Sequence, residues 1–154
     1  MIRLYKPEYD DLSFRRDLLS DEETMSYNHA WGGTIPFPEE DWADWYACWV
    51  ADPGKDRFYR YILDERGAFI GEIAYRYDGE LGGCAANVIV HARYRGKGYG
   101  GRALEALCAA AKDNGVGRLY DDIAADNPAA GMFLRRGFSE VGRTKDKIIL
   151  MKEL

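Results

Sequence analysis

The chain has 154 residues, 47% of them hydrophobic, a length and composition that fit one domain with a core of its own. A formal net charge of −5 argues against a nucleic-acid partner, and the lack of an apolar run of about 18 residues or of an apolar N-terminal segment argues against a membrane-spanning or exported protein. The three cysteines have no metal-ligand spacing, so we expect no metal site. We expect reduced thiols, buried at Cys48 and Cys108, which fits a cytoplasmic location.

The first third of the chain predicts one strand, two helices and a long loop. A strand is expected at residues 2–4, and a helix at 8–19 follows Pro7. Residues 20–38 have no clear period and are interpreted as irregular. A second helix begins after Pro38 and ends near residue 52. Its aromatic residues recur at helical spacing and are interpreted as core: Trp42, Trp45, Tyr46 and Trp49.

The middle of the chain predicts an antiparallel sheet. Two β-type runs, 58–63 and 68–77, flank the turn-forming stretch 64–67 and indicate a hairpin. A loop at 78–83 leads into a third run that ends in the β-branched sequence Val88-Ile89-Val90.

A glycine-rich stretch joins this third run to a helix. Its sequence, Arg95 to Gly101, is RGKGYGG, and apolar residues recur at helical spacing after it. Glycine allows a close approach to the backbone, and the first N–H groups of a helix have no intrahelical acceptor. The junction therefore predicts a binding site for a phosphate group.

Two other interpretations of the glycines stay open. Gly96, Gly98 and Gly101 also satisfy G-x-G-x-x-G, with Asp121 about 20 residues further on, as in dinucleotide-binding folds. That motif normally lies on the first strand, whereas here about 85 residues precede it and about 50 follow. A plain structural loop is the other interpretation, although such a loop seldom carries Arg95 and Lys97 at a strand-to-helix junction.

The remaining residues predict a strand, a short helix and a final hairpin. Asn114 and Gly115 end the long helix, and residues 116–123 form a strand. A helix is expected at 128–136, followed by strands at 138–142 and 147–152.

Two motifs resemble those of the GCN5-related N-acetyltransferases, the GNAT superfamily. RGKGYG is similar to the family's acetyl-CoA loop through Arg95, Gly98 and Gly100, and DNPAAGMFLRRGF, which begins at Asp126, is similar to a second family segment. The two stand at the family's spacing, and the resemblance covers roughly residues 58–154. It implies an α/β (α+β) fold with a mixed, mostly antiparallel central sheet flanked by helices.

The resemblance also implies a cofactor site. We expect one domain over residues 1–154, with acceptor-side helices and loop at 1–57 and an acetyl-CoA-binding core at 58–154. In the family, loop amides hold the pyrophosphate and the preceding strand pairs with the pantetheine arm. The residues implied to bind acetyl-CoA are Ile89, Val90, His91, Arg95, Gly96, Lys97, Gly98, Tyr99, Gly100, Gly101, Asp126, Asn127 and Phe133.

The implied reaction is attack of a neutral primary amine on the thioester. Glu72, a charged residue within a predicted strand, is the candidate base, although an ion pair with Arg76 or Arg60 would also explain it. By resemblance, a backbone N–H near Val90 stabilises the oxyanion. His91 is interpreted as a strand residue rather than a catalytic one.

The family's motif departs from its usual form at two positions. Many relatives have a tyrosine that protonates the departing thiolate at the position where this chain has Phe133. Here Tyr94, Tyr120 or water could supply that proton, or the thiolate could leave without a proton donor. Asp126 stands where the family often has asparagine, and Asn127 is an alternative contact for the pantetheine amide.

Charge suggests where the acceptor binds. Residues 1–52 carry 12 acidic and 4 basic side chains, net −8, whereas residues 53–154 carry 14 and 17, net +3. Acidic and aromatic groups suit a cationic amine, which makes Glu23, Tyr27 and Trp31 candidate substrate-binding residues. Solvated acidic helix faces, and aromatic residues that simply cover the core, would also explain these features.

The expected protein is thus an acetyl-CoA-dependent N-acetyltransferase acting on a small-molecule amine. Its acidic, aromatic N-terminal part is the ground for choosing a small acceptor. A protein N-terminal or lysine acetyltransferase and a non-catalytic acetyl-CoA-binding module are the alternatives. Family analogy adds a homodimer.

Overall fold

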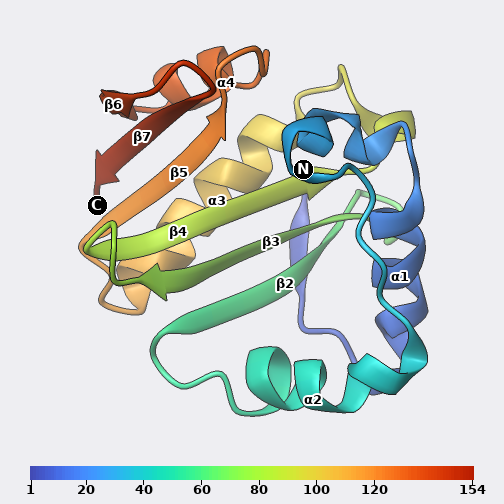
Figure 1. The fold of residues 1–154 in the computed structure, drawn as a ribbon. Coiled ribbons are helices and arrows are strands. Elements are labelled where there is room, and N and C mark those ends of the chain that lie inside the picture. Colours follow the sequence, from blue (N-terminus) through green and yellow to red (C-terminus); the bar gives the residue numbers. More distant parts are fainter.

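The computed structural model describes all 154 residues and contains one seven-stranded sheet with the strand order β1-β2-β3-β4-β5-β7-β6 (Figure 1). The strands are β1 (Arg3–Tyr5), β2 (Arg57–Leu63), β3 (Phe69–Asp78), β4 (Gly83–Val90), β5 (Arg118–Ala124), β6 (Ser139–Arg143) and β7 (Lys147–Glu153). The α-helices are α1 (Leu12–Ser20), α2 (Trp42–Tyr46), α3 (Tyr99–Asp113) and α4 (Ala130–Leu134). Shorter helical turns are η1 (Tyr9–Asp11), η2 (Thr24–Trp31), η3 (Glu39–Asp41), η4 (Ala47–Ala51) and η5 (Ala92–Tyr94).

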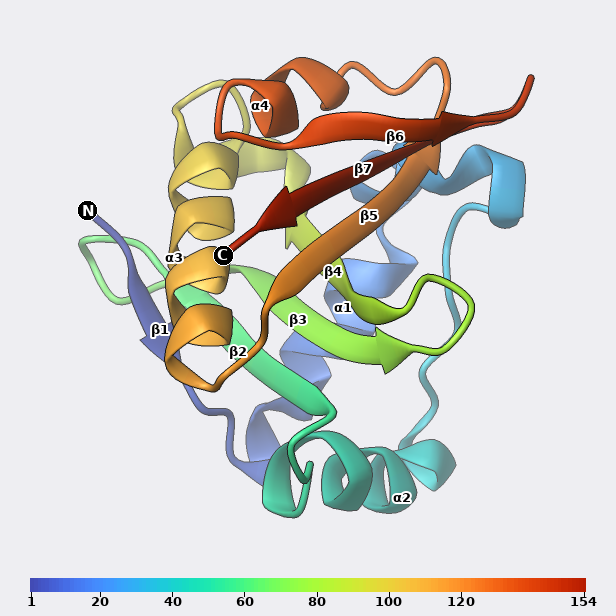
Figure 2. The ribbon, with the colours of Figure 1, turned by 90° about the vertical axis from the view of Figure 1, so that its left-hand side faces the viewer.

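The sheet contains one parallel pair, β4 and β5, and that pair is very short. Cys84 and Ala85 are the only residues of β4 that pair with β5, opposite Leu119 and Tyr120. Beyond this point the two strands separate, as Figures 1 and 2 show. All other neighbouring strands are antiparallel. The mixed, mostly antiparallel sheet and the order of elements predicted from the sequence are confirmed.

Successive side chains of a β-strand point to opposite faces of the sheet, and helices cover both faces. Leu104 and Leu107 of α3 are fully buried in one core with Ile73 of β3. Leu18 of α1 lies in a second, smaller core that contains Ile89 of β4. Figure 2 shows α3 on one side of the sheet and α1 on the other. The forked strands β4 and β5 therefore lie between two helical layers.

Three expectations need correction. Residues 20–38 are not wholly irregular, because η2 occupies Thr24–Trp31. Cys48 is exposed, because the buried side of the helical turn η4 is occupied by Val50 instead, while Cys84 and Cys108 are buried free thiols. The aromatic stripe of the second helical region is only partly core: Trp42 is buried, but Trp45 and Trp49 line the recess described below.

No helix combines the length and apolar character needed to cross a membrane.

Candidate active site

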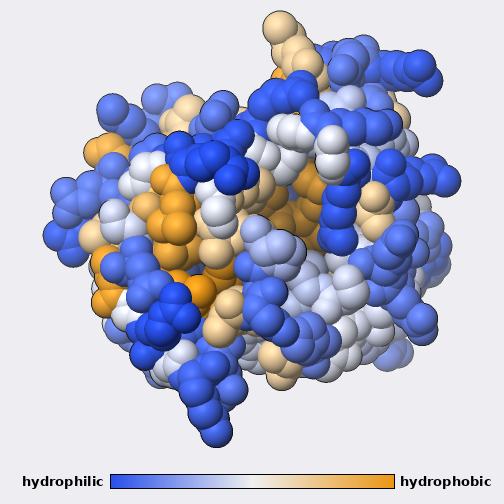
Figure 3. Space-filling model, turned by 90° about the horizontal axis from the view of Figure 1, so that it is seen from above, coloured by the Kyte–Doolittle hydropathy of each residue, from blue (hydrophilic) through white to orange (hydrophobic).

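A recess of about 1260 Å³ opens where β4 and β5 separate. Seen from above, the surface is hollowed, and apolar side chains lie in its depth below a polar rim (Figure 3). Residues of η2 and the tryptophans Trp45 and Trp49 line it on one side, and α4 contributes Met132 and Phe133 on the other.

The fork leaves one edge of β4 without a strand partner. The amide of His91 donates to the carbonyl oxygen of Ile70 on β3 at 2.8 Å. Because alternate residues of an antiparallel strand turn their N–H groups to opposite sides, the amides of Val88 and Val90 point away from β3, toward the fork. An edge of this kind can pair with an extended ligand.

The glycine loop at the start of α3 continues this free edge. Gly96 and Gly98 have φ angles of +78° and +84°, values that only glycine adopts without strain. The first intrahelical hydrogen bond runs from the Arg102 amide to the Gly98 carbonyl oxygen, at 3.2 Å. The N–H groups that precede Arg102 in α3 are therefore available to an anion.

The side chain of Arg95 is engaged by the protein itself. Its Nη2 donates to the carbonyl oxygen of Thr24 at 2.6 Å, and its Nε donates to that of Val90 at 3.1 Å. The guanidinium group thus links the start of η2 to the end of β4.

Gly101 of α3 packs directly against the side chain of Arg136. An added Cβ at this position would lie 1.9 Å from Nη2 of Arg136.

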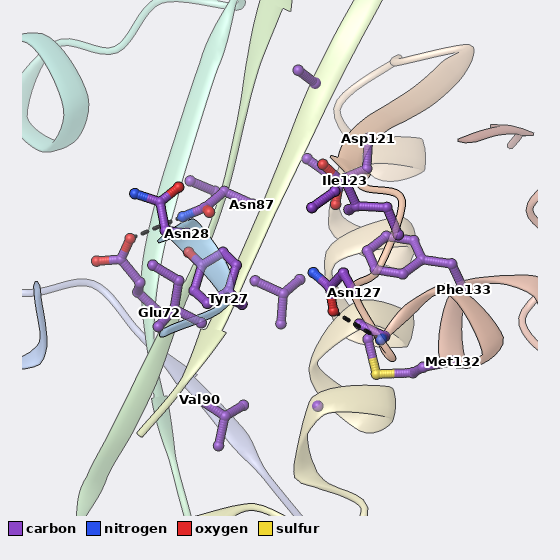
Figure 4. A pocket seen from close by; sticks show the side chains of 18 of the residues that line it. Tyr27, Asn28, Glu72, Asn87, Val90, Asp121, Ile123, Asn127, Met132 and Phe133 are labelled. Carbon is purple, nitrogen blue, oxygen red and sulfur yellow. Dashed lines mark hydrogen bonds between the residues drawn. The ribbon is translucent and has the colours of Figure 1, made fainter. Parts of the chain in front are cut away.

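Glu72 of β3 is buried, at 1% exposure, with donors on both carboxylate oxygens. The Tyr59 hydroxyl donates to Oε1 at 2.5 Å, and Asn87 Nδ2 donates to Oε2 at 3.0 Å (Figure 4 shows the latter). Burial, followed by the charge of Glu72, raises the pKa of Tyr59 well above its ordinary value, so the hydroxyl keeps its proton. These contacts suit an ionised carboxylate.

The ion-pair partner of Glu72 is Arg15 of α1, whose Nε lies 3.4 Å from Oε1. The expected alternatives, Arg76 and Arg60 of the same sheet, form no ion pair with it. The Arg15 guanidinium also lies 4.3 Å from the ring centroid of Trp45 and 4.5 Å from that of Phe37. It is therefore held between a carboxylate and aromatic faces.

The β5 side of the recess is chemically different. Asp121 and Ile123 project from β5 close to Phe133 of α4, across the recess from Glu72 (Figure 4). Burial, and then the charge of Asp122, raise the pKa of Asp121 well above its ordinary value.

Comparison with known proteins identifies the family. A family model described as an acetyltransferase (GNAT) domain matches residues 1–138. The chain belongs to the GNAT acetyltransferase family.

Solved structures show the same GNAT fold. Spermidine N-acetyltransferase from Vibrio cholerae, in complex with CoA and spermine, is 20% identical, with a TM-score of 0.79 over 99% of this chain and 95% of that one. Ribosomal-protein-alanine N-acetyltransferase from Brucella melitensis is 22% identical, with a TM-score of 0.74 over 100% and 99% of the two chains. A GNAT-family acetyltransferase from Bacillus anthracis is 19% identical, with a TM-score of 0.75 over 99% and 94%.

Most residues that the GNAT motifs imply lie around the recess. Those that line it are Ile89, Val90, Arg95, Gly96, Gly98, Tyr99, Gly100, Gly101, Asp126, Asn127 and Phe133, together with Glu72, Tyr27 and Trp31. Lys97 and Glu23 do not line it. His91 also lies outside the lining, and it follows the end of β4 and caps η5 instead of lying within the strand as expected. Its Nδ1 accepts from the Arg93 amide, and its Nε2 is 3.8 Å from Asp21.

The GNAT motifs gave no indication of several polar residues in the recess. Arg15 and Tyr59 surround Glu72, but their distance from it in the sequence hides the contact. Asn87 could have been found, because it is a single amide within the apolar run Cys84–Val90. Asp121 entered only the dinucleotide interpretation, although its place in a short strand made it unusual.

Proposed function

We propose that this GNAT protein transfers the acetyl group of acetyl-CoA to a primary amine of a small molecule. The observation that carries the proposal is the continuous path from the free edge of β4 to the free amides of α3. The residues along it fit acetyl-CoA: an extended pantetheine arm can pair with the free edge of β4, and a diphosphate can reach the loop around Gly98.

The loop would hold the cofactor mainly through its backbone. Arg95 uses its guanidinium group to hold η2 in place, so its expected contribution to the pyrophosphate is its amide. Lys97 is exposed beside the loop and would add long-range attraction for phosphate. Asn127 already accepts the Ala129 amide through Oδ1 at 2.9 Å, which leaves its NH2 group for the pantetheine arm.

Acetyl transfer would begin on the side of β3. When acetyl-CoA is bound, the thioester supplies the electrophilic carbonyl carbon, and the Val90 amide would donate to the oxyanion that develops. Glu72 would draw the acceptor's ammonium group and accept its proton, directly or through water. The Tyr59, Asn87 and Arg15 side chains fix the orientation of the Glu72 carboxylate for this task.

The acceptor would lie among aromatic side chains. The aromatic residues that line the recess are Tyr27 and Trp31 of η2 and Trp45 and Trp49 of the second helical region. Aromatic faces pack well against the stem of an amine and against its cationic group. Because Glu23 lies outside the recess, the attraction for a cation would come from Glu72 and not from the acidic residues at the start of η2.

Thiol release tests the proposal. The protein is mixed with acetyl-CoA and a panel of polyamines, amino acids, aminoglycosides and short peptides, and free CoA thiol is followed. Thiol release that requires a small amine is the expected result. Thiol release that does not depend on any amine would contradict the proposed transfer, and a preference for peptides would favour a protein substrate.

A further inference from the structure

The guanidinium group of Arg15 lies in the recess without an acceptor for its N–H groups. Its Nε is the only polar side-chain atom of the protein that is buried and has no hydrogen-bond partner, although Oε1 of Glu72 lies 3.4 Å away. Its two Nη groups donate to no atom of the protein either. So many unused donors are unusual on a side chain that is only 15% exposed, and they point to an acceptor brought by a ligand.

Other arginines of the recess use their donors within the protein. Nη2 of Arg95 and Nε of Arg136 each donate to a backbone carbonyl oxygen, at 2.6 and 2.9 Å. Around Arg15, aromatic rings take the place of carbonyl groups, with the centroids of Trp45 and Phe37 at 4.3 and 4.5 Å from its guanidinium carbon. An aromatic face attracts the positive charge but offers no lone pair to the N–H groups. The Arg15 donors therefore stay free for a ligand.

The carboxylate of Glu72 places an opposite charge directly beside this guanidinium group. Glu72 lies opposite Ile89 of β4 in the sheet register, one residue from the Val90 amide that is proposed to face the oxyanion. Asn87 Nδ2 donates to Glu72 (Figure 4), and Asn87 Oδ1 accepts no hydrogen bond from the protein. An ammonium group can therefore bind at Glu72 and Asn87. A ligand held there has the free N–H groups of Arg15 within reach.

The charges of the recess do not suit a polycation. On the side of β3, the single negative charge of Glu72 is offset by Arg15. The other acidic residues of the lining come from β5 or from the loop after it: Asp121, Asp122 and Asp126. A polyamine or an aminoglycoside would bring further positive charges toward Arg15. A ligand with one positive and one negative charge complements the pair instead.

We propose that the acceptor is a free α-amino acid, whose amine lies at Glu72 and whose carboxylate binds the guanidinium group of Arg15. The inference rests on the proposed function and names its substrate class. A carboxylate accepts two parallel hydrogen bonds from a guanidinium group, which supplies the acceptors that Arg15 lacks. The side chain of the amino acid would pack against Trp45 and Trp49. In a peptide or protein, the α-carboxyl group of the first residue is an amide, and the match to Arg15 is lost.

Matched pairs of acceptors test the proposal with wild type. Each pair consists of an L-amino acid and its α-carboxamide, for leucine, phenylalanine and glutamate, and thiol release from acetyl-CoA gives kcat/KM. The carboxylate of the acid favours the protonated amine, so chemistry alone would make the amide the better nucleophile. We expect the acid of the best pair to react about 100-fold faster than its amide. An amide that reacts as well as its acid would overturn the proposal.

Arg15→Lys tests the guanidinium group itself. Lysine keeps a positive charge beside Glu72 but lacks the planar fork, so the acid-to-amide ratio of kcat/KM should fall about tenfold, through a higher KM for the acid. Because both rates come from one preparation, the ratio does not depend on how much of the variant is folded. A merely structural arginine would lower both rates alike, and an unchanged ratio would contradict the proposal. Arg66→Lys, at an exposed arginine outside the recess, is the control and should keep the wild-type ratio.

These outcomes remain distinct from a failure of the proposed function. If wild type releases no thiol with any amine, acetyl transfer itself is wrong. Calorimetric titration of the protein with each acid and its amide, in the presence of CoA, still tests the subsite because it needs no reaction. Tighter binding of the acid supports the subsite, and equal or undetectable binding of the two overturns it. If other amines react while both members of every pair are inert, acetyl transfer stands and the amino-acid acceptor is wrong.

Discussion

Arg15 and Glu72, one on a helix and the other on a sheet strand, form a buried ion pair with 3.4 Å between Nε and Oε1. The pair joins α1 to the middle of β3, and Trp45 and Phe37 cover the guanidinium group. Because the carboxylate is almost inaccessible to water, its charge depends on the partners that the fold supplies.

Removal of Arg15 is expected to destabilise the protein strongly. Arg15→Ala leaves the Glu72 charge buried without its ion-pair partner and exposes the aromatic faces, which should lower the free energy of unfolding by about 3–5 kcal/mol. Urea unfolding measures the change. Arg66→Ala, at an exposed arginine, is the control and should change stability by less than about 0.5 kcal/mol. Equal effects of the two substitutions would contradict a structural role for the ion pair.

Glu72→Gln separates the charge of Glu72 from its packing. The amide oxygen can still accept from Tyr59, so the fold should persist, but the proton acceptor is lost. We expect kcat/KM for the amine to fall about 100-fold, with the affinity for CoA unchanged. Full kcat/KM across the pH range would show that Glu72 is not the base. Glu80→Gln, at an exposed carboxylate, should leave the kinetics unaltered.

A side chain at Gly101 is expected to destabilise the protein, because the guanidinium group of Arg136 occupies the space that the side chain would need. An alanine Cβ would lie 1.9 Å from Nη2 of Arg136, whose Nε donates to the Gly101 carbonyl oxygen at 2.9 Å. Gly101→Ala should therefore displace the guanidinium group and lower the free energy of unfolding by about 1–2 kcal/mol. Gly117→Ala, where an added Cβ meets nothing within 4 Å, is the matched control. If both variants melt alike, the contact has no energetic weight.

Asp121 should make stability depend on pH. Its pKa is raised in the folded state, so the folded protein holds this proton at pH values where the unfolded chain has lost it. Folding is thereby penalised increasingly as the pH rises above the unfolded pKa of about 4. Asp121→Asn removes the penalty. Its melting temperature should exceed that of wild type at pH 7 and match it near pH 4. A constant difference across this range would contradict the raised pKa.

The order of the elements could be predicted because local signals mark their ends. Glycine residues with positive φ, such as Gly98, Gly115 and Gly137, occur where helices begin or end. The loop at Arg95 and the segment at Asp126 gave the family, and the structure places most of the implied residues around one recess.

Contacts between distant elements could not be predicted in the same way. Strand periodicity shows that Glu72 shares a face with Ala74, but it does not show which helix covers that face, and so Arg15 was not expected. The Glu23 prediction relied on composition alone. Composition cannot distinguish a carboxylate that lines a recess from one that points into solvent.

The central claim is that the amides at the start of α3 hold coenzyme A, and calorimetric titration with CoA tests it most directly. Gly98→Glu should abolish binding, because it strains a residue with φ of +84° and places a carboxylate beside the diphosphate. Gly115→Glu has the same backbone strain, with φ of +86°, at the other end of α3, and should bind CoA like wild type. We expect measurable heat of CoA binding for wild type and Gly115→Glu and none for Gly98→Glu. No heat with wild type, or equal affinity in all three proteins, would contradict it.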